Sequence, residues 1–303
     1  MTFPRWLPLV VLPGLAALVA AQENQFRIRT DLVVLHVGVR DRRGAYVGDL
    51  DEQAFRVYED GQLREVSLFR REDEPATIGL VVDSSASMSA VRPLVIAAGA
   101  AFAEASHPGD EFFAIAFGND VRPALPASRP FTSDAGELRD ALAAAIDPHG
   151  RTALFDAISA AIDYSARGSR ARTALVVISD GGDNASRTTF SQLATKVHTS
   201  NVVLYSVAIV DPVDEDARPE LLRELSRGTG GEAFEPKAAA DVHTALQNVA
   251  RDLRHSYVLG YAPISAADGK LHKLRVTVVA PGRSGLSVRA RSAYLAWPSP
   301  VGR

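Results

Sequence analysis

The spacing of apolar residues changes twice along the chain and divides the sequence into three regions. Residues 26–70 contain short runs rich in β-branched residues, which are typical of strands. From residue 77 to about residue 255, fully apolar runs alternate with longer stretches of helical period. Strand character returns from residue 256 onward. The pattern therefore predicts a central α/β region between two β-rich flanks.

The central region predicts a mainly parallel sheet with helices on both faces, because strands that are apolar throughout have no side left for water. We expect strands at residues 78–82, 112–117, 174–179 and 202–209, and a short one near 233–234. The expected helices span residues 94–105, 137–146, 154–167, 190–199, 219–227 and 238–253. Strands and helices that alternate in this way indicate a doubly wound α/β fold.

The two flanks are expected to pair with each other. The N-terminal flank predicts strands at residues 32–39, 55–58 and 66–69, with a hairpin turn at Asp60-Gly61 and a polar linker at residues 71–75. The C-terminal flank predicts strands at residues 257–261, 274–279 and 287–290. Neither flank has enough strands for a stable sandwich of its own. We therefore hypothesise one small β-sandwich, built from both flanks, into which the α/β region is inserted.

The N-terminus predicts a secretory signal peptide over residues 1–21. Arg5 precedes an apolar segment at residues 6–20, and small residues offer a cleavage point before Gln22. The alternative is a retained membrane anchor, but the segment is short for a span and carries two prolines. The remaining divisions are a β-rich region over 22–74, the α/β domain over 75–255 and a second β-rich region over 256–303. The expected location is the bacterial periplasm or the cell exterior.

Composition indicates an ordinary globular protein without disulfides and gives no support to a general nucleic-acid binder. Hydrophobic residues make up 47% of the chain and charged residues 23%, which is ordinary for a globular fold. A formal net charge of -3 gives no support to a general nucleic-acid binder. The chain has no cysteine, so its stability must come from its core rather than from disulfides.

Candidate chemistry begins where the first strand of the central region ends. Asp83 follows an apolar run, and Ser85 and Ser87 follow it at alternating positions. One carboxylate and two hydroxyls form a compact set of hard oxygen donors, which suits a small divalent cation such as Mg²⁺. Ligands in open α/β sheets collect at the carboxyl ends of the strands. Thr152, before a helix, and Asp180, at the end of another strand, are expected at the same edge.

This set resembles the metal-ion-dependent adhesion site of von Willebrand factor A domains. The residues match that pattern one for one: Asp83, Ser85 and Ser87 in Asp-x-Ser-x-Ser, then Thr152, then Asp180 before glycine. The resemblance covers residues 75–255 and implies a Rossmann-like sheet. The flanks, with Tyr-Glu-Asp-Gly at 58–61, are similar to those of a secreted bacterial family common in acidobacteria.

The resemblance implies a protein-binding or adhesion module that is not an enzyme. In such domains the metal bridges to a carboxylate of the partner, so an acidic side chain of a partner protein is expected here. The residue analogous to Asp180 acts largely through water, which would leave the ion electron-poor. Mg²⁺ is the expected ion, with Mn²⁺ or Ca²⁺ as alternatives; no membrane span after signal cleavage and no nucleic-acid partner are expected.

Simpler interpretations exist for each residue. Ser85 or Ser87 could cap the following helix, and Asp180 could form a turn before glycine.

Two alternative functions are also open. One is a structural component of an envelope assembly in which the metal only stabilises the fold. Another is a Mg²⁺-dependent phosphatase-like hydrolase that uses Asp83 as nucleophile. That mechanism requires a second acidic residue two positions after the nucleophile, where this chain has Ser85.

Overall fold

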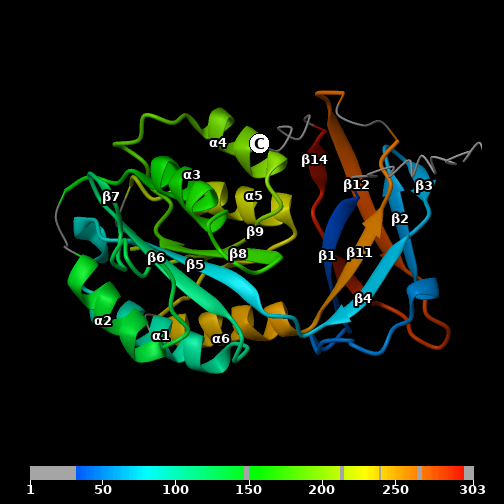
Figure 1. The fold of residues 1–303 in the computed structure, drawn as a ribbon, viewed down its shortest axis with the longest axis horizontal. Helices are drawn as coiled ribbons and strands as arrows, with labels where there is room; N and C mark the ends of the chain where they lie inside the picture. Colours follow the sequence, from blue (N-terminus) through cyan, green and yellow to red (C-terminus); the bar gives the residue numbers. More distant parts are fainter. Residues whose placement is uncertain (1–31, 147–149, 212–214, 239, 265–267, 297–303) are drawn as a thin grey trace, which may run out of the picture. The chain divides into compact units, whose positions relative to one another are not determined.

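A computed structural model describes residues 32–296, except residues 147–149, 212–214, 239 and 265–267. The predicted signal segment therefore lies outside the described residues. The central region forms a six-stranded sheet of order β10-β9-β8-β5-β6-β7, in which every pairing is parallel except that of β7 with β6 (Figure 1). Its strands are β5 (Ala76–Asp83), β6 (Glu111–Phe117), β7 (Val121–Pro123), β8 (Arg172–Ser179), β9 (Val203–Ala208) and β10 (Ala233–Phe234).

Helices cover both faces of this sheet, as predicted (Figure 1). Alternating residues of β5 explain why the strand is apolar throughout. Leu80 and Val82 pack with α1 (Arg92–Ala105), α2 (Ala135–Ala145) and α6 (Asp241–Arg254). Val81 points to the opposite core, with α3 (Leu154–Ser165), α4 (Phe190–Thr199) and α5 (Pro219–Thr229). The predicted α/β fold class is confirmed.

The flanks pair as predicted. One antiparallel sheet has the order β13-β1-β11-β4 and the other β14-β12-β2-β3, so each sheet mixes strands from both flanks. The strands are β1 (Val33–Arg40), β2 (Phe55–Glu59), β3 (Gln62–Arg64), β4 (Leu68–Glu72), β11 (Ser256–Tyr261), β12 (Leu271–Val278), β13 (Ser287–Arg289) and β14 (Ala293–Leu295). Residues of both sheets, such as Val37 and Val57, share one hydrophobic core. The two sheets therefore form a β-sandwich.

Two connections join the sandwich to the α/β core. The predicted linker at residues 71–75 is partly wrong, because β4 continues to Glu72 and pairs with β11. Only residues 73–75 separate β4 from β5. On the return path, α6 ends at Arg254 and β11 begins at Ser256. Both crossings are short, and the amino end of β5 is therefore held close to the sandwich.

Candidate functional site

Asp83 lies at the carboxyl end of β5 and is 2% exposed. Its carboxylate accepts a 2.6 Å hydrogen bond from the Ser179 hydroxyl and a 2.8 Å bond from the Ser85 backbone N–H. Burial raises the pKa of Asp83 to about 6, although these hydrogen bonds act in the opposite direction. A buried carboxylate without a cation is costly, because it loses water without gaining an opposite charge. A cation placed at this carboxylate would remove that cost.

The two predicted serines link Asp83 to Asp180. The hydroxyls of Ser85 and Ser87 lie 3.1 Å apart, and the Ser87 hydroxyl donates a 2.7 Å bond to Oδ2 of Asp180. Ser85 is buried, whereas Ser87 is exposed. Capping does not explain Ser85, because its side chain makes no cap bond to the short 3₁₀ helix Ala86–Met88 that it precedes. The structure thus joins four of the predicted residues in one hydrogen-bonded chain.

Asp180 follows β8, and the glycine after it shapes the loop. Gly181 has φ of 87°, a left-handed conformation that favours glycine. A Cβ at this position would lie 2.4 Å from the backbone oxygen of Arg218, so a larger residue does not fit. Oδ1 of Asp180 accepts a 2.8 Å bond from the Gly182 N–H, which is the expected turn-forming role. Oδ2 accepts the hydrogen bond from Ser87. The turn and the contact with Ser87 therefore use different oxygens of the Asp180 carboxylate.

Thr152 is held at the same edge of the sheet by its backbone. The Thr152 N–H donates to the Asn184 side chain at 2.9 Å, and the Thr152 carbonyl accepts from the N–H of Asn184. The next residue, Ala153, donates to the carbonyl of Gly118, directly after β6. Within the described part of the chain, no hydrogen bond joins the Thr152 side chain to the other four predicted residues. The loop carrying Thr152 is therefore positioned by the ends of β6 and β8.

Three supporting residues lie outside the predicted ligand set. Ser179 orients the Asp83 carboxylate, and Asn184 fixes the Thr152 loop. Asp183 accepts bonds from the Phe155 N–H at 3.2 Å and the Ser186 hydroxyl at 2.5 Å, which secures the start of α3. Asp183 and Asn184 follow Asp180 closely, and the sequence allowed two interpretations: support for the rim of the site, or an ordinary polar turn. Their only available signal was their position just after Asp180, at the same strand end.

The donor set fits a hard divalent cation. Within the described ranges, no group of three or more His, Cys, Asp or Glu side chains could hold a metal. If Asp83 and Asp180 are ligands, they offer two carboxylates, and hydroxyls would supply the other side-chain ligands. Ser85, Ser87 and Thr152 carry the hydroxyls that the sequence placed at this edge. Oxygen donors of this kind suit Mg²⁺, Mn²⁺ or Ca²⁺ better than softer metals.

A small polar cavity opens beside the strand ends. It has a volume of about 110 Å³, and its lining includes Ser84, Asn119, Asp120 and Arg122. Ser84 directly follows Asp83, and the other three belong to the turn between β6 and β7 and to β7 itself. A wider hollow of about 900 Å³ lies around residues 124–141 and includes none of the predicted ligands. The smaller cavity is the one next to the candidate metal site.

Solved structures with a similar fold include two informative cases. A von Willebrand factor type A protein from Catenulispora acidiphila has 13% identity and a TM-score of 0.51, and the match covers 91% of this chain and 76% of that one. Proximal thread matrix protein 1 from the mussel byssus has 13% identity and a TM-score of 0.50, with 62% and 48% covered. This chain therefore spans about half of the byssus protein. At such identities the likeness concerns the fold alone.

Sequence comparison supplies the family. No curated protein matches this sequence closely enough to count as a relative. The model of the von Willebrand factor type A domain, however, matches residues 77–250, which is more than half of the chain. The matched range runs from the second residue of β5 into α6 and includes Asp83, Thr152 and Asp180. The chain therefore belongs to the von Willebrand factor type A domain family.

Proposed function

We propose that this protein is a metal-dependent binding or adhesion module for a partner protein. The observation that carries the proposal is the chain of contacts from Asp83 through Ser85 and Ser87 to Asp180. It gathers oxygen donors from two strand ends at one edge of the sheet, with Ser87 exposed to solvent. Asp83, Ser85, Ser87, Thr152 and Asp180 would hold the ion. Mg²⁺ is the first candidate, followed by Mn²⁺ and Ca²⁺.

A bound cation would supply positive charge that a partner can reach. Three of the five ligands are neutral hydroxyls, so the protein itself only partly offsets the charge of the ion. The buried Asp83 carboxylate, oriented by Ser179, would anchor the cation from below. The exposed Ser87 marks the side open to solvent. This arrangement supports a partner that contributes a Glu or Asp carboxylate.

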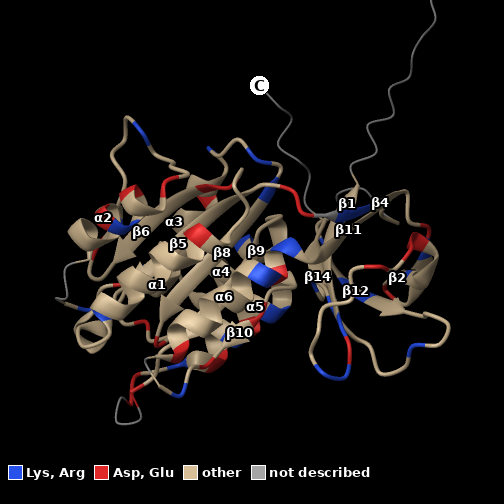
Figure 2. Ribbon diagram, turned by 90° about the horizontal axis from the view of Figure 1, so that it is seen from below, with Lys and Arg blue, Asp and Glu red and all other residues tan. Residues whose placement is uncertain are grey.

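Charged residues of both signs lie beside the candidate site, as they do elsewhere on the described chain. Lys and Arg are interspersed with Asp and Glu along the described ribbon (Figure 2). Beside the candidate site, Arg122 is 63% exposed and lies 3.8 Å from Asp120, which is 75% exposed. These side chains line the 110 Å³ cavity next to Ser84 and would contact a residue that neighbours the bound carboxylate. A partner with mixed charge around its acidic residue fits best.

The location proposed from the N-terminus is the periplasm or the cell exterior. The segment over residues 1–21 carries that proposal, and it lies outside the described part of the chain. Among the described residues, none of the helices is long and apolar enough to span a bilayer. An adhesion role is consistent with such a location, because partners are then met at the cell surface.

A second candidate function is a structural envelope component in which the ion only stabilises the fold. The burial of Asp83 favours it, since neutralising a buried carboxylate stabilises the folded state. Thermal melting and partner capture are measured together, because any ion bound to the folded state raises the melting temperature. An ion with a structural role alone raises it, and removing that ion from protein that stays folded leaves partner capture unchanged. The phosphatase-like alternative is tested separately, by an assay of hydrolysis with a generic aryl phosphate and Mg²⁺. Activity that is lost in Asp83→Asn would replace the binding proposal with an enzyme.

The decisive experiment is affinity purification from an envelope fraction with the whole chain immobilised in Mg²⁺ and eluted with EDTA. We expect EDTA to release partners, and Asp83→Ala to capture none. Asp140→Ala is the matched control, because it removes a carboxylate that is 71% exposed on α2. Direct titration with Mn²⁺, followed by its paramagnetic resonance, tests ion binding without a partner. Partner capture that ignores both EDTA and Asp83→Ala contradicts the proposal.

A further inference from the structure

The outer face of the sheet β13-β1-β11-β4 is polar where it meets the α/β core. In β1, Leu35, Val37 and Val39 point into the sandwich core. The alternate residues His36 and Arg40 therefore point to the opposite face. On the neighbouring strands, Ser256 and Arg289 both pair with Gly38, so they share that outer face.

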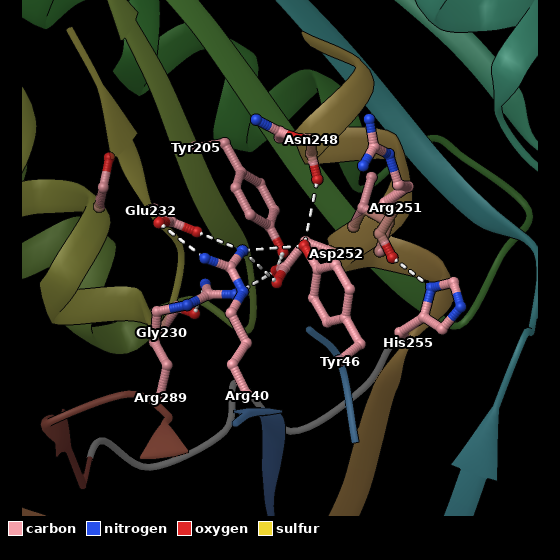
Figure 3. A network of polar contacts seen from close by, with 12 residues as sticks. Arg40, Tyr46, Tyr205, Gly230, Glu232, Asn248, Arg251, Asp252, His255 and Arg289 are labelled. Carbon is pink, nitrogen blue, oxygen red and sulfur yellow. Dashed lines mark hydrogen bonds and ion pairs between the residues drawn. The ribbon is translucent and has the colours of Figure 1, made fainter. Parts of the chain in front are cut away.

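One half of this junction is neutralised by ion pairs (Figure 3). Arg40 pairs with Glu232 at 2.7 Å, and Arg289 pairs with Asp252, which is 2% exposed on α6. The Tyr205 hydroxyl donates a 2.6 Å bond to the same carboxylate. Burial alone would raise the pKa of Asp252, but Arg289, Tyr205 and Arg40 together outweigh burial and hold this pKa below its usual range. In this half of the junction, each guanidinium is therefore paired with a carboxylate.

The other half carries cations without a carboxylate. Arg172 is 4% exposed and Arg291 is 7% exposed. Arg172 donates to the Leu253 carbonyl, and Arg291 donates to the Ser200 carbonyl at 2.9 Å. Within the described ranges, neither guanidinium forms an ion pair. Nε and Nη2 of Arg172, Nε of Arg291 and Nδ1 of His36 are buried without a hydrogen-bond partner.

These three side chains converge. The charges of Arg172 and Arg291 both act on the His36 imidazole. Arg291 follows two residues after Arg289, which pairs with Gly38 in β1. Arg172 reaches the junction from the start of β8, and its bond to Leu253 lies at the end of α6, just before β11. Burial and the charges of Arg172 and Arg291 lower the pKa of His36 to about 3. Positive charge is therefore concentrated around the imidazole.

The carboxylates nearby are committed elsewhere. Asp110 feels the charge of Arg172, but its oxygens accept bonds from the N–H groups of Ala76 and His107. Asp252 is bound by Arg289 and Tyr205. Burying two guanidiniums with free N–H donors destabilises the folded state unless an anion compensates their charge. Because both are almost fully enclosed, that anion must be small.

We propose that a small inorganic anion binds between Arg172, Arg291 and His36 and ties the β-sandwich to the α/β core. Guanidinium N–H groups bind such anions through charge-assisted hydrogen bonds. A partner protein could not reach these atoms, which sets this site apart from the candidate metal edge at the other end of β5. The anion would act as an internal counter-ion of the junction, independent of the divalent cation.

The test is the melting temperature of the whole chain in EDTA, at constant ionic strength, with sodium gluconate exchanged for chloride, sulfate or phosphate. We expect at least one small anion to raise the temperature saturably, by roughly 5–10 °C at about 100 times its dissociation constant. Bulky gluconate should have no such effect. Arg291→Met and Arg172→Met should lose the response. In gluconate they should melt no lower than the unchanged protein, because each removes an uncompensated buried charge.

Arg139→Met is the control, because it removes an arginine that is 54% exposed on α2, where it pairs with Asp140. It should keep the full response. If the buried variants do not fold, the His36 imidazole is followed by NMR in the unchanged protein during the titration. Its resonances should move saturably with the anion that stabilises. Equal effects of all anions, an unchanged response in Arg291→Met, or a His36 signal that does not move would each overturn the proposal.

Discussion

The Ser87 hydroxyl donates a 2.7 Å hydrogen bond to the Asp180 carboxylate across 93 residues of sequence. This contact joins the loop after β5 to the loop after β8, two neighbouring strands of the parallel sheet. The bond forms because parallel strands end at the same edge and both loops turn immediately. Any cation held by one loop would therefore also meet the other. The relationship makes Ser87 a sensitive point for testing the metal site.

Ser87→Ala is expected to weaken Mg²⁺ or Mn²⁺ binding by about 10-fold or more while leaving the fold intact. The side chain is exposed, so little packing is lost, but one oxygen donor and the link to Asp180 disappear. Calorimetric titration with Mn²⁺ measures the change. Ser89→Ala is the matched control, because Ser89 is also exposed and lies two residues further on. Equal affinity in both variants would remove Ser87 from the ligand set.

Much of this edge could be predicted from residue pattern alone. An apolar run ending in Asp83 indicates a buried strand, and strand ends of a parallel sheet collect ligands. What the pattern could not supply was the partner of each oxygen. Ser179 donates to Asp83 across 96 residues, and its position as the last residue of β8 looks from sequence like an ordinary strand end. Contacts of this kind depend on strand order and register.

Short strands were the other limit. β7 spans Val121–Pro123 and β14 spans Ala293–Leu295, three residues each, too few to show an alternating pattern. Their existence depends on a longer neighbour to pair with, β6 and β12 respectively. The end of β4 was missed for a related reason. Its charged residues 71 and 72 looked like the start of a linker, but both pair with residues of β11.

Tyr294→Phe should destabilise the sandwich by about 1.5–3 kcal/mol, the usual range for a lost hydrogen bond to a charged group. The hydroxyl donates a 2.5 Å bond to Glu59, which is fully buried, and ties β14 to β2 across the sheet. The Ile264 N–H and the more distant Arg64 remain as partners of Glu59. Urea denaturation measures the loss. Tyr58→Phe should be near neutral, since within the described residues its hydroxyl has no hydrogen bond; equal losses would contradict the assignment.

Gly79→Ala should destabilise the α/β core by about 1–3 kcal/mol through overpacking. A Cβ on this residue of β5 would lie 2.3 Å from Cζ of Phe113 and 2.6 Å from Cδ2 of Leu175. Both neighbours are fully buried and cannot move aside cheaply. Gly48→Ala is the control, because no atom lies within 4 Å of the added carbon. Urea denaturation should separate the two variants, and a neutral Gly79→Ala would mean that Phe113 repacks freely.

His272 should make the sandwich less stable as pH rises. Its Nδ1 lies 2.7 Å from Asp60 and its Nε2 lies 3.1 Å from Asp268, while Glu59 is 3.7 Å from Nδ1 and Tyr294 stacks on the ring. Burial opposes the charge, but the two aspartates outweigh it and raise the pKa of His272 above its ordinary value. The charged imidazole therefore contributes stability that is fully present below about pH 6.5, the unfolded pKa.

That contribution is lost as pH rises through the higher pKa of the folded state. The free energy of unfolding of the unchanged protein should fall over this window, and His272→Gln should flatten the pH dependence there. The ring resonances of His272, followed by NMR, give the folded pKa directly. Asp268→Asn provides a second check, since removing one carboxylate should lower that pKa and move the loss of stability to lower pH. A His272 that titrates at or below 6.5 in the folded protein would show that burial, not Asp60 and Asp268, controls the ring.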